Sequence, residues 1–172
     1  MSRRPDAEPP RRAATDAEAR ALASSLRLQI LRLTLDEALT NKEIAERVGR
    51  NPATVLHHVR TLVDTGFLRA EAVRRGVRGS REVPYRATGK SWQLEVSGGH
   101  QAMVTAFLEE SARAPAEDVE MIRLGLRLTA EEEAELWTRL YALLEDFRHR
   151  PHPVDTTPWS LFIAMHPDTG RR

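Results

Sequence analysis

The sequence contains no cysteine among its 172 residues. This absence excludes disulfide bonds, thiolate metal ligands and cysteine nucleophiles, and it makes the cytoplasm the expected compartment. No apolar run approaches the roughly 20 residues of a membrane-spanning helix. The N-terminal stretch MSRRPDAEPPRRAATDAEAR lacks an apolar core, so we expect no signal peptide. These absences favour a soluble, globular protein over a secreted or membrane-spanning one.

Lysine is almost absent, with 2 Lys against 24 Arg. A bias of this kind is typical of GC-rich genomes, so a single arginine is weak evidence of function. The net charge of +1 hides an uneven distribution: residues 1–100 carry 18 Lys/Arg and 12 Asp/Glu, and residues 101–172 carry 8 and 13. This asymmetry indicates that the first part faces a polyanion, with incidental helix-surface charge as the open alternative.

Three regions follow one another along the chain. Residues 1–13 hold prolines and arginines with almost no large apolar side chain, which predicts a disordered basic tail. Residues 14–96 have helical and then strand patterns, and we assign them to one domain. Residues 97–172 begin with a helix candidate over 99–113, and we expect this region to serve dimerisation or regulation.

Two short helices joined by a tight turn are predicted within the first domain. Thr40 precedes Glu43 by three residues, a capping-box pattern that begins a helix over residues 41–48. Gly49 supplies the left-handed turn that ends this helix, and Asn51 can cap the next one. The spacing therefore predicts a helix-turn-helix.

The second helix has an apolar face and a polar face. Val55, Val59 and Leu62 recur at intervals of four and three residues, which directs them to the core. Arginine can bond guanine through two nitrogens, and threonine and histidine can reach base edges or phosphates. The face opposite the core carries Ala53, Thr54, His57, Arg60 and Thr61.

A basic hairpin pattern follows directly. Residues 67–73 and 82–88 have strand patterns, and Pro84 indicates an edge strand. Between them, Gly76 and Gly79 would let an arginine-rich tip approach a DNA backbone or enter a minor groove. A solvated hairpin is the alternative, but its position directly after two helices indicates a wing.

These motifs predict a binding surface for DNA. Lys42 and Arg50 flank the turn and suit phosphate contacts. The predicted DNA-binding residues are Lys42, Arg50, Asn51, Thr54, His57, Arg60, Thr61, Arg74, Arg75, Arg78 and Arg81. We predict no catalytic residue, no cofactor-binding residue and no metal ligand, so an enzyme is not expected.

The last third of the chain has a strand–helix–strand pattern. Apolar side chains alternate with Arg or Gly over residues 122–128, which predicts a strand. Thr129 and Glu132 form another capping-box pattern, opening an amphipathic helix to about Phe147. Residues 159–166, WSLFIAMH, predict a final buried strand. The large aromatic residues outside the DNA-reading region are expected to pack in the core or dimer, and lining an effector pocket is the alternative.

The segments LASSLRLQILRLTL, LTNKEIAERVG and NPATVLHHVRTLVDTGFL, with a hairpin ending in PYRAT, resemble the ArsR-type winged helix-turn-helix family of bacterial repressors. The resemblance covers residues 20–90. It implies a homodimer on a pseudo-palindromic operator, with residues 52–63 in the major groove and the 74–81 tip beside the backbone. It also implies cytoplasmic transcription control, in which a signal relieves repression.

The chain departs from the metal-sensing members of that family. Those members use a cysteine pair, or carboxylate and histidine ligands on the last helix. This chain has no cysteine, and His100, Glu109 and Glu110 do not form a two-histidine pattern. Metal sensing is therefore not expected. Leu56 stands where a small polar residue is usual, and contact with a thymine methyl or packing in the dimer both remain open.

The sequence thus predicts an α+β fold: a winged helix-turn-helix domain with a C-terminal strand–helix–strand extension. The expected function is sequence-specific binding of double-stranded DNA by an ArsR-like transcriptional regulator, with repression as the expected sign. The expected partners are operator DNA and a second copy of the chain, without a membrane or a cofactor, and an unidentified small-molecule effector stays open. The alternative is a winged-helix module that binds proteins and not DNA.

Overall fold

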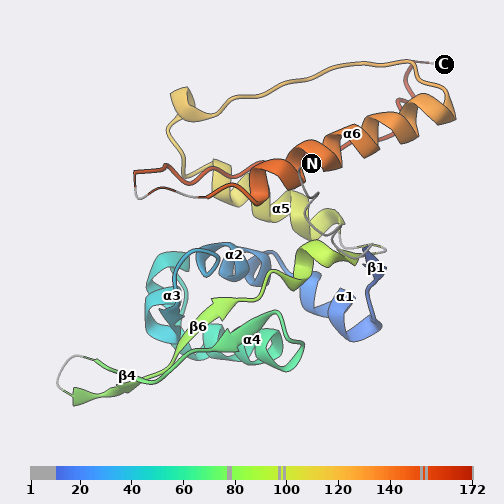
Figure 1. Cartoon of the computed structure of the whole chain (residues 1–172). Helices are drawn as coiled ribbons and strands as arrows, with labels where there is room; N and C mark the ends of the chain where they lie inside the picture. Colours follow the sequence, from blue (N-terminus) through green and yellow to red (C-terminus); the bar gives the residue numbers. More distant parts are fainter. Residues whose placement is uncertain are drawn as a thin grey trace, which may run out of the picture. The chain divides into compact units, whose positions relative to one another are not determined.

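The computed structural model describes residues 11–76, 79–96, 98, 100–151, 153 and 155–171. It divides the chain into two compact units, Met1–Asp118 and Val119–Arg172, which we describe separately (Figure 1). The elements of the first unit are β1 (Arg12–Ala13), α1 (Asp16–Leu22), α2 (Ser25–Leu33), β2 (Leu39–Thr40), α3 (Asn41–Val48), α4 (Pro52–Asp64), β3 (Leu68–Ala70), β4 (Arg74–Arg75), β5 (Arg81–Glu82), β6 (Pro84–Ala87), η2 (Lys90–Gln93), β7 (Leu94–Glu95), α5 (His100–Ser111) and η3 (Ala116–Asp118).

The predicted α+β class and the winged helix-turn-helix are confirmed. Helices α3 and α4 follow one another across the Gly49 turn, where φ is +63°. An antiparallel sheet in the order β2-β6-β3 lies beside them, and the separate β4-β5 ladder extends from it as the wing (Figure 1). The chain therefore passes from the second helix of the pair through β3 straight into the wing.

The edge position predicted for Pro84 is wrong. Strand β6 is the central strand, paired with β2 through Thr40 and Pro84 and with β3 through Leu68 and Ala87. Pro84 is the first residue of β6, where a missing N–H costs little even in a central strand. The partner that the sequence analysis missed is β2, which is only two residues long.

The core of the first unit forms where the helix pair meets the sheet. Val55, Val59 and Leu62 are completely buried, which confirms the predicted inner face of α4. Phe67 and Leu68 continue this core from α4 into β3. Burial of each such side chain contributes roughly 1.5–3 kcal/mol, so the core fixes which face of α4 remains outside.

Helix α5 belongs to the first unit, although we assigned it from the sequence to the C-terminal region. Gln29 of α2 donates a hydrogen bond from Nε2 to Oε2 of Glu109 at 2.5 Å. Arg32 of α2 forms an ion pair with Glu110, with 3.4 Å between Nε and Oε2. Polar contacts thus tie α5 to the helix that precedes the helix-turn-helix.

The disordered tail predicted over residues 1–13 is wrong at its C-terminal end. Residues 1–10 lie outside the described residues. Arg12 and Ala13 form β1, which pairs in parallel with Leu94 and Glu95 of β7. The physical reason is the nearby carboxylate of Glu18, which accepts two hydrogen bonds from the Arg12 guanidinium, at 2.7 and 2.9 Å.

Glu18 is a buried carboxylate that connects three segments of the first unit. Besides Arg12, it receives the Lys90 ammonium at 2.7 Å and the backbone N–H of Thr15 at 2.8 Å. The hydrogen bonds from Arg12, then those from Lys90 and Thr15, hold the pKa of this carboxyl well below its usual range. This cluster gives no local signal in the sequence, because Lys90 is distant from Arg12 and Glu18 along the chain.

Replacing Glu18 with Gln is expected to destabilise the protein by about 1–3 kcal/mol near neutral pH, because it leaves the two cations that contact Glu18 without their carboxylate. Because the pKa of Glu18 is lower in the folded protein than in the unfolded chain, its ionised carboxylate stabilises the fold at pH values above the unfolded-state pKa. This stabilisation is lost as the pH falls from the unfolded-state pKa through the folded-state pKa. The difference between wild type and Glu18→Gln should therefore shrink on acidification below about pH 4. Urea unfolding at several pH values measures this.

The control for that prediction is Glu37→Gln, since Glu37 is exposed and pairs with Arg47 at the surface. An exposed pair of this kind contributes about 0–1 kcal/mol. A difference for Glu18→Gln that equals the control, or that grows at acid pH, would contradict the assigned role of Glu18.

The second unit contains α6 (Ala130–Arg148). The predicted capping box is confirmed: the Thr129 side chain accepts from the Glu132 N–H, and the Glu132 carboxylate accepts from the Thr129 N–H at 2.7 Å. The strands predicted over residues 122–128 and 159–166 are wrong, because both segments are described and neither forms a ladder. The alternation of apolar side chains along residues 122–128 defines one apolar face, but a strand also requires hydrogen bonds to a neighbouring strand. Ile122 remains 89% exposed.

Candidate nucleic-acid interface

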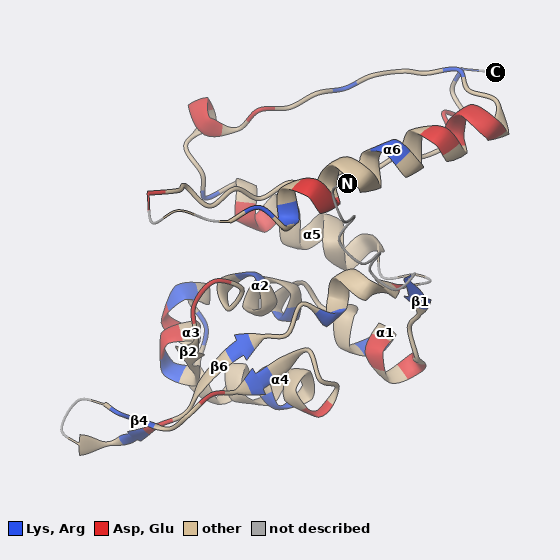
Figure 2. Ribbon diagram, viewed as in Figure 1, with Lys and Arg blue, Asp and Glu red and all other residues tan. Residues whose placement is uncertain are grey.

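The exposed face of α4 presents several of the predicted reading residues. Thr54, His57 and Arg60 are exposed, on the side of the helix away from its buried face. Figure 2 shows Lys and Arg on α3, α4 and the wing strand β4. Asp64 follows Arg60 by one helical turn and would repel phosphate, so the N-terminal part of α4 is the better end for DNA.

Two other predicted residues use their side chains within the protein. The Asn51 side chain accepts the backbone N–H of Ala53 at 2.8 Å and so caps α4, as its position before the helix predicts. The Thr61 hydroxyl donates to the carbonyl of His57 at 3.1 Å. Both contacts position or stabilise α4. They also leave these two side chains with fewer free hydrogen-bonding groups for a base.

Asn41 is a positioning residue that the sequence analysis did not find. Its Nδ2 donates to the carbonyl of Pro52 at 2.9 Å, joining the first residue of α3 to the first residue of α4. This bond fixes the N-terminal end of α4 relative to α3. An Asn at the helix start, eleven residues before the carbonyl, gives no periodic signal in the sequence.

Lys42 and Arg50 lie on either side of the turn, as predicted, and both are exposed. Lys42 has Glu46 one helical turn away, with 3.9 Å between Nζ and Oε1. Exposed pairs of this kind contribute little and exchange readily, so Lys42 remains available to an external anion. The backbone N–H of Arg50 donates to Ala45 and ends α3, which leaves its guanidinium outside.

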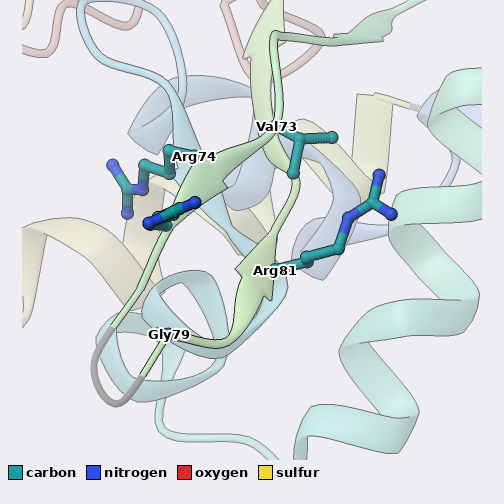
Figure 3. A pocket seen from close by; sticks show the side chains of 5 residues that line it. Val73, Arg74, Gly79 and Arg81 are labelled. Atoms are coloured by element: carbon teal, nitrogen blue, oxygen red, sulfur yellow. The ribbon is translucent and has the colours of Figure 1, made fainter.

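The two faces of the wing differ in charge. In the β4-β5 register, Arg74 lies opposite Glu82, and Arg75 lies opposite Arg81. Figure 3 shows the side chains of Arg74 and Arg81 pointing to opposite sides of the hairpin. One pair of opposed ladder positions therefore holds a base and an acid, whereas the other holds two arginines.

Arg74 is held by carboxylates of the protein itself. Its Nη2 lies 2.5 Å from Oε1 of Glu43, and its Nε lies 3.3 Å from Oε2 of Glu82. The Thr40 backbone N–H, with a smaller contribution from Arg74, lowers the pKa of Glu43. In this structure Arg74 fastens the wing to the N-terminus of α3, which differs from the phosphate contact predicted for it.

Arg75 and Arg81 have no ion pair with any residue that the structure describes. Like charges directly opposite each other on a sheet repel, and an anion between them removes that cost. They line an open hollow of about 480 Å³ together with Val73, Arg74 and Gly79 (Figure 3). The predicted contact Arg78 lies outside the described residues.

The adjacent histidines of α4 have separate environments. His57 is exposed. His58 is half-buried, and its Nδ1 lies 3.4 Å from Nη1 of Arg27. Burial, and then the charge of Arg27, lower the pKa of His58, so the neutral ring is favoured near pH 7. His58 therefore has a local structural contact, whereas the His57 ring is open to solvent.

Two further observations concern the part of the chain that the structure describes. Its His, Asp and Glu side chains form no group of three that could hold a metal ion. Its helices include none that is both long and apolar enough to span a membrane.

Comparisons with known proteins find one family model and several solved structures that are similar to this chain. Residues 22–71 match the family model of a helix-turn-helix domain. Among solved structures, reduced HlyU from Vibrio cholerae is 20% identical over 58% of this chain and 87% of its own, with a TM-score of 0.34. An ArsR-like transcriptional regulator from Rhodococcus sp. RHA1 is 19% identical over 77% and 87%, with a TM-score of 0.38.

A third solved structure is the homodimeric winged helix-turn-helix DNA-binding domain Mb0332 from Mycobacterium bovis. It is 25% identical over 60% of this chain and 82% of its own, with a TM-score of 0.34. A search of curated proteins finds no match. The matched residues 22–71 include the α3–α4 helix pair, and the β4-β5 hairpin that follows them forms the wing.

Proposed function

We propose that this protein binds double-stranded DNA in a sequence-specific manner and regulates transcription in the ArsR-like way. The observation that carries the proposal is the position of α4: its buried face is fixed by the core, and its outer face presents Thr54, His57 and Arg60. A helix held in this way after a tight turn suits the major groove. The wing follows it along the chain and offers phosphate contacts.

The residues divide into two roles under this proposal. Arg60, His57 and Thr54 read base edges, and Lys42, Arg50, Arg75 and Arg81 hold phosphates. Asn51 and Thr61 act mainly on α4 itself, and Arg74 keeps the wing in place. The phosphate contacts supply affinity for any duplex, whereas the base contacts supply discrimination.

The same proposal includes a homodimer in the cytoplasm that reads a pseudo-palindromic operator, with repression as the sign of regulation. The ArsR-like resemblance and the homodimeric Mb0332 support these points. Two copies of α4 would then enter successive major grooves about 34–36 Å apart. The absence of cysteine from the sequence supports a trigger other than thiolate-bound metal.

Duplex binding at two salt concentrations tests the function. If the protein binds DNA through the residues named, its affinity for duplex DNA should fall steeply as salt rises, because each phosphate contact releases counterions. A gel-shift or anisotropy titration of the full chain at about 50 and 200 mM salt measures this. No affinity at either salt concentration would favour the protein-interaction module instead.

A further inference from the structure

The segment 122–128 of the second unit carries four exposed apolar side chains and belongs to no strand ladder among the described residues. Within the described chain, its backbone groups make no hydrogen bond to one another or to other residues. Ile122 is 89% exposed and Leu124 is 72% exposed. Extended backbone with free N–H and C=O groups is a template for another strand, and a contiguous exposed apolar stripe marks an interaction site.

The order of residues in this segment points to its partner. The sequence Ile-Arg-Leu-Gly-Leu-Arg-Leu reads the same in both directions around Gly125, apart from Ile in place of Leu at position 122. When two identical segments pair in antiparallel orientation about a two-fold axis at Gly125, each residue lies opposite the residue of the other copy that is equally far from Gly125 on its other side. A second copy of the same segment therefore matches at every position.

We propose that residues 122–128 of two copies pair as antiparallel strands across a two-fold axis at Gly125. In this register Ile122 lies opposite Leu128 and Leu124 lies opposite Leu126 of the other copy. Because side chains alternate along a strand, all eight apolar side chains fall on one face of the ribbon. The strand that the sequence predicts here then forms on assembly, where its backbone groups find partners.

The other face of the ribbon carries arginines. Arg123 of one copy lies opposite Arg127 of the other, and this repulsion weakens the pair modestly at low salt. Salt screens it, so the contact should tighten as salt rises, whereas DNA binding should weaken. The contact gives the proposed homodimer a site in the second unit. It rests on that part of the proposed function, and its test reads assembly without DNA.

Single cysteine substitutions test the register sharply, because the chain has no other thiol. With Gly125→Cys, the two Cα atoms would lie about 4.5–5.5 Å apart, within reach of a disulfide. The added Cβ meets the guanidinium of Arg171, which can move because it is the far end of a flexible side chain. Mild oxidation should convert most of this variant to a covalent dimer.

Arg123→Cys is the matched control on the same face. Its two Cα atoms would be displaced by four residues, roughly 14 Å, which is beyond disulfide reach. It should not cross-link with itself, but a mixture of Arg123→Cys and Arg127→Cys should give the mixed dimer. Gel electrophoresis without reductant measures all three cases, and circular dichroism confirms that each variant is folded.

Sedimentation provides a second readout that needs no new bond. Leu124→Lys should raise the dimer dissociation constant by about tenfold or more, because the charge would face the apolar side of the ribbon. Leu35→Lys, at an exposed leucine of the first unit, should leave that constant unchanged. A folded Gly125→Cys variant that stays monomeric after oxidation, or equal cross-linking of Arg123→Cys alone, would overturn the proposal whether or not the protein binds DNA.

Discussion

The double variant Arg75→Ala/Arg81→Ala should bind every duplex about 10- to 100-fold more weakly than the wild type at roughly 0.1 M salt. These two arginines occupy opposed positions of the wing ladder and have no carboxylate partner among the described residues. Each lost phosphate contact should reduce the slope of log affinity against log salt by about 0.9. Anisotropy titrations of operator and unrelated duplexes over a salt series measure both effects.

Arg74→Ala is the matched control, because Arg74 lies on the same strand but is held by Glu43 and Glu82. It should reduce affinity by loosening the wing, while changing the salt slope less than the double variant does. The assignment of the wing faces would be wrong if Arg74→Ala lowered the slope as much as the double variant. It would also be wrong if the double variant bound like the wild type.

Replacing Arg60 with Ala should lower the specificity of the protein for its operator sequence. Arg60 lies on the outer face of α4, where its guanidinium can form two bonds with a guanine. Its loss should lower discrimination between operator and scrambled duplex by about 1–3 kcal/mol per half-site. Competition binding of the two duplexes to each variant measures this ratio directly.

The control is Arg139→Ala, an exposed arginine of α6 that pairs with Glu135. It removes the same charge from a helix of the second unit and should leave the ratio unchanged. Equal loss of affinity for operator and scrambled duplex in Arg60→Ala would show a phosphate contact in place of a base contact.

Much of the helix-turn-helix could be predicted from the sequence because its determinants are local. The Thr40–Glu43 capping box and the Gly49 turn each depend on a few consecutive residues. The inner face of α4 depends only on helical spacing. For the same reason, the sequence predicted which side of α4 faces outward.

Contacts between segments distant along the chain could not be predicted in this way. Glu18 forms an ion pair with Lys90, and Arg74 forms one with Glu43. No periodic pattern in the sequence indicates either ion pair. The pairing of β6 on both sides depends on a two-residue strand that has no sequence signal. These contacts decide where the wing sits and which arginines remain free for DNA.

The C-terminal strands show a third kind of limit. Alternation in residues 122–128 correctly identifies side chains of one face, yet no strand forms within one chain. A strand requires hydrogen bonds from a neighbour, and the alternation does not name that neighbour. The self-matching order of residues around Gly125 supplies that information, and it places the neighbour in a second copy.

Selection of bound duplexes from a randomised library by the purified protein is the decisive test of sequence-specific DNA binding by α4. We expect enrichment of an inverted repeat whose half-sites lie about 10–10.5 base pairs apart, centre to centre. We also expect that Arg60→Ala blurs the repeat at a guanine position. Recovery of unenriched sequences by the folded wild-type protein would contradict sequence-specific DNA binding by α4.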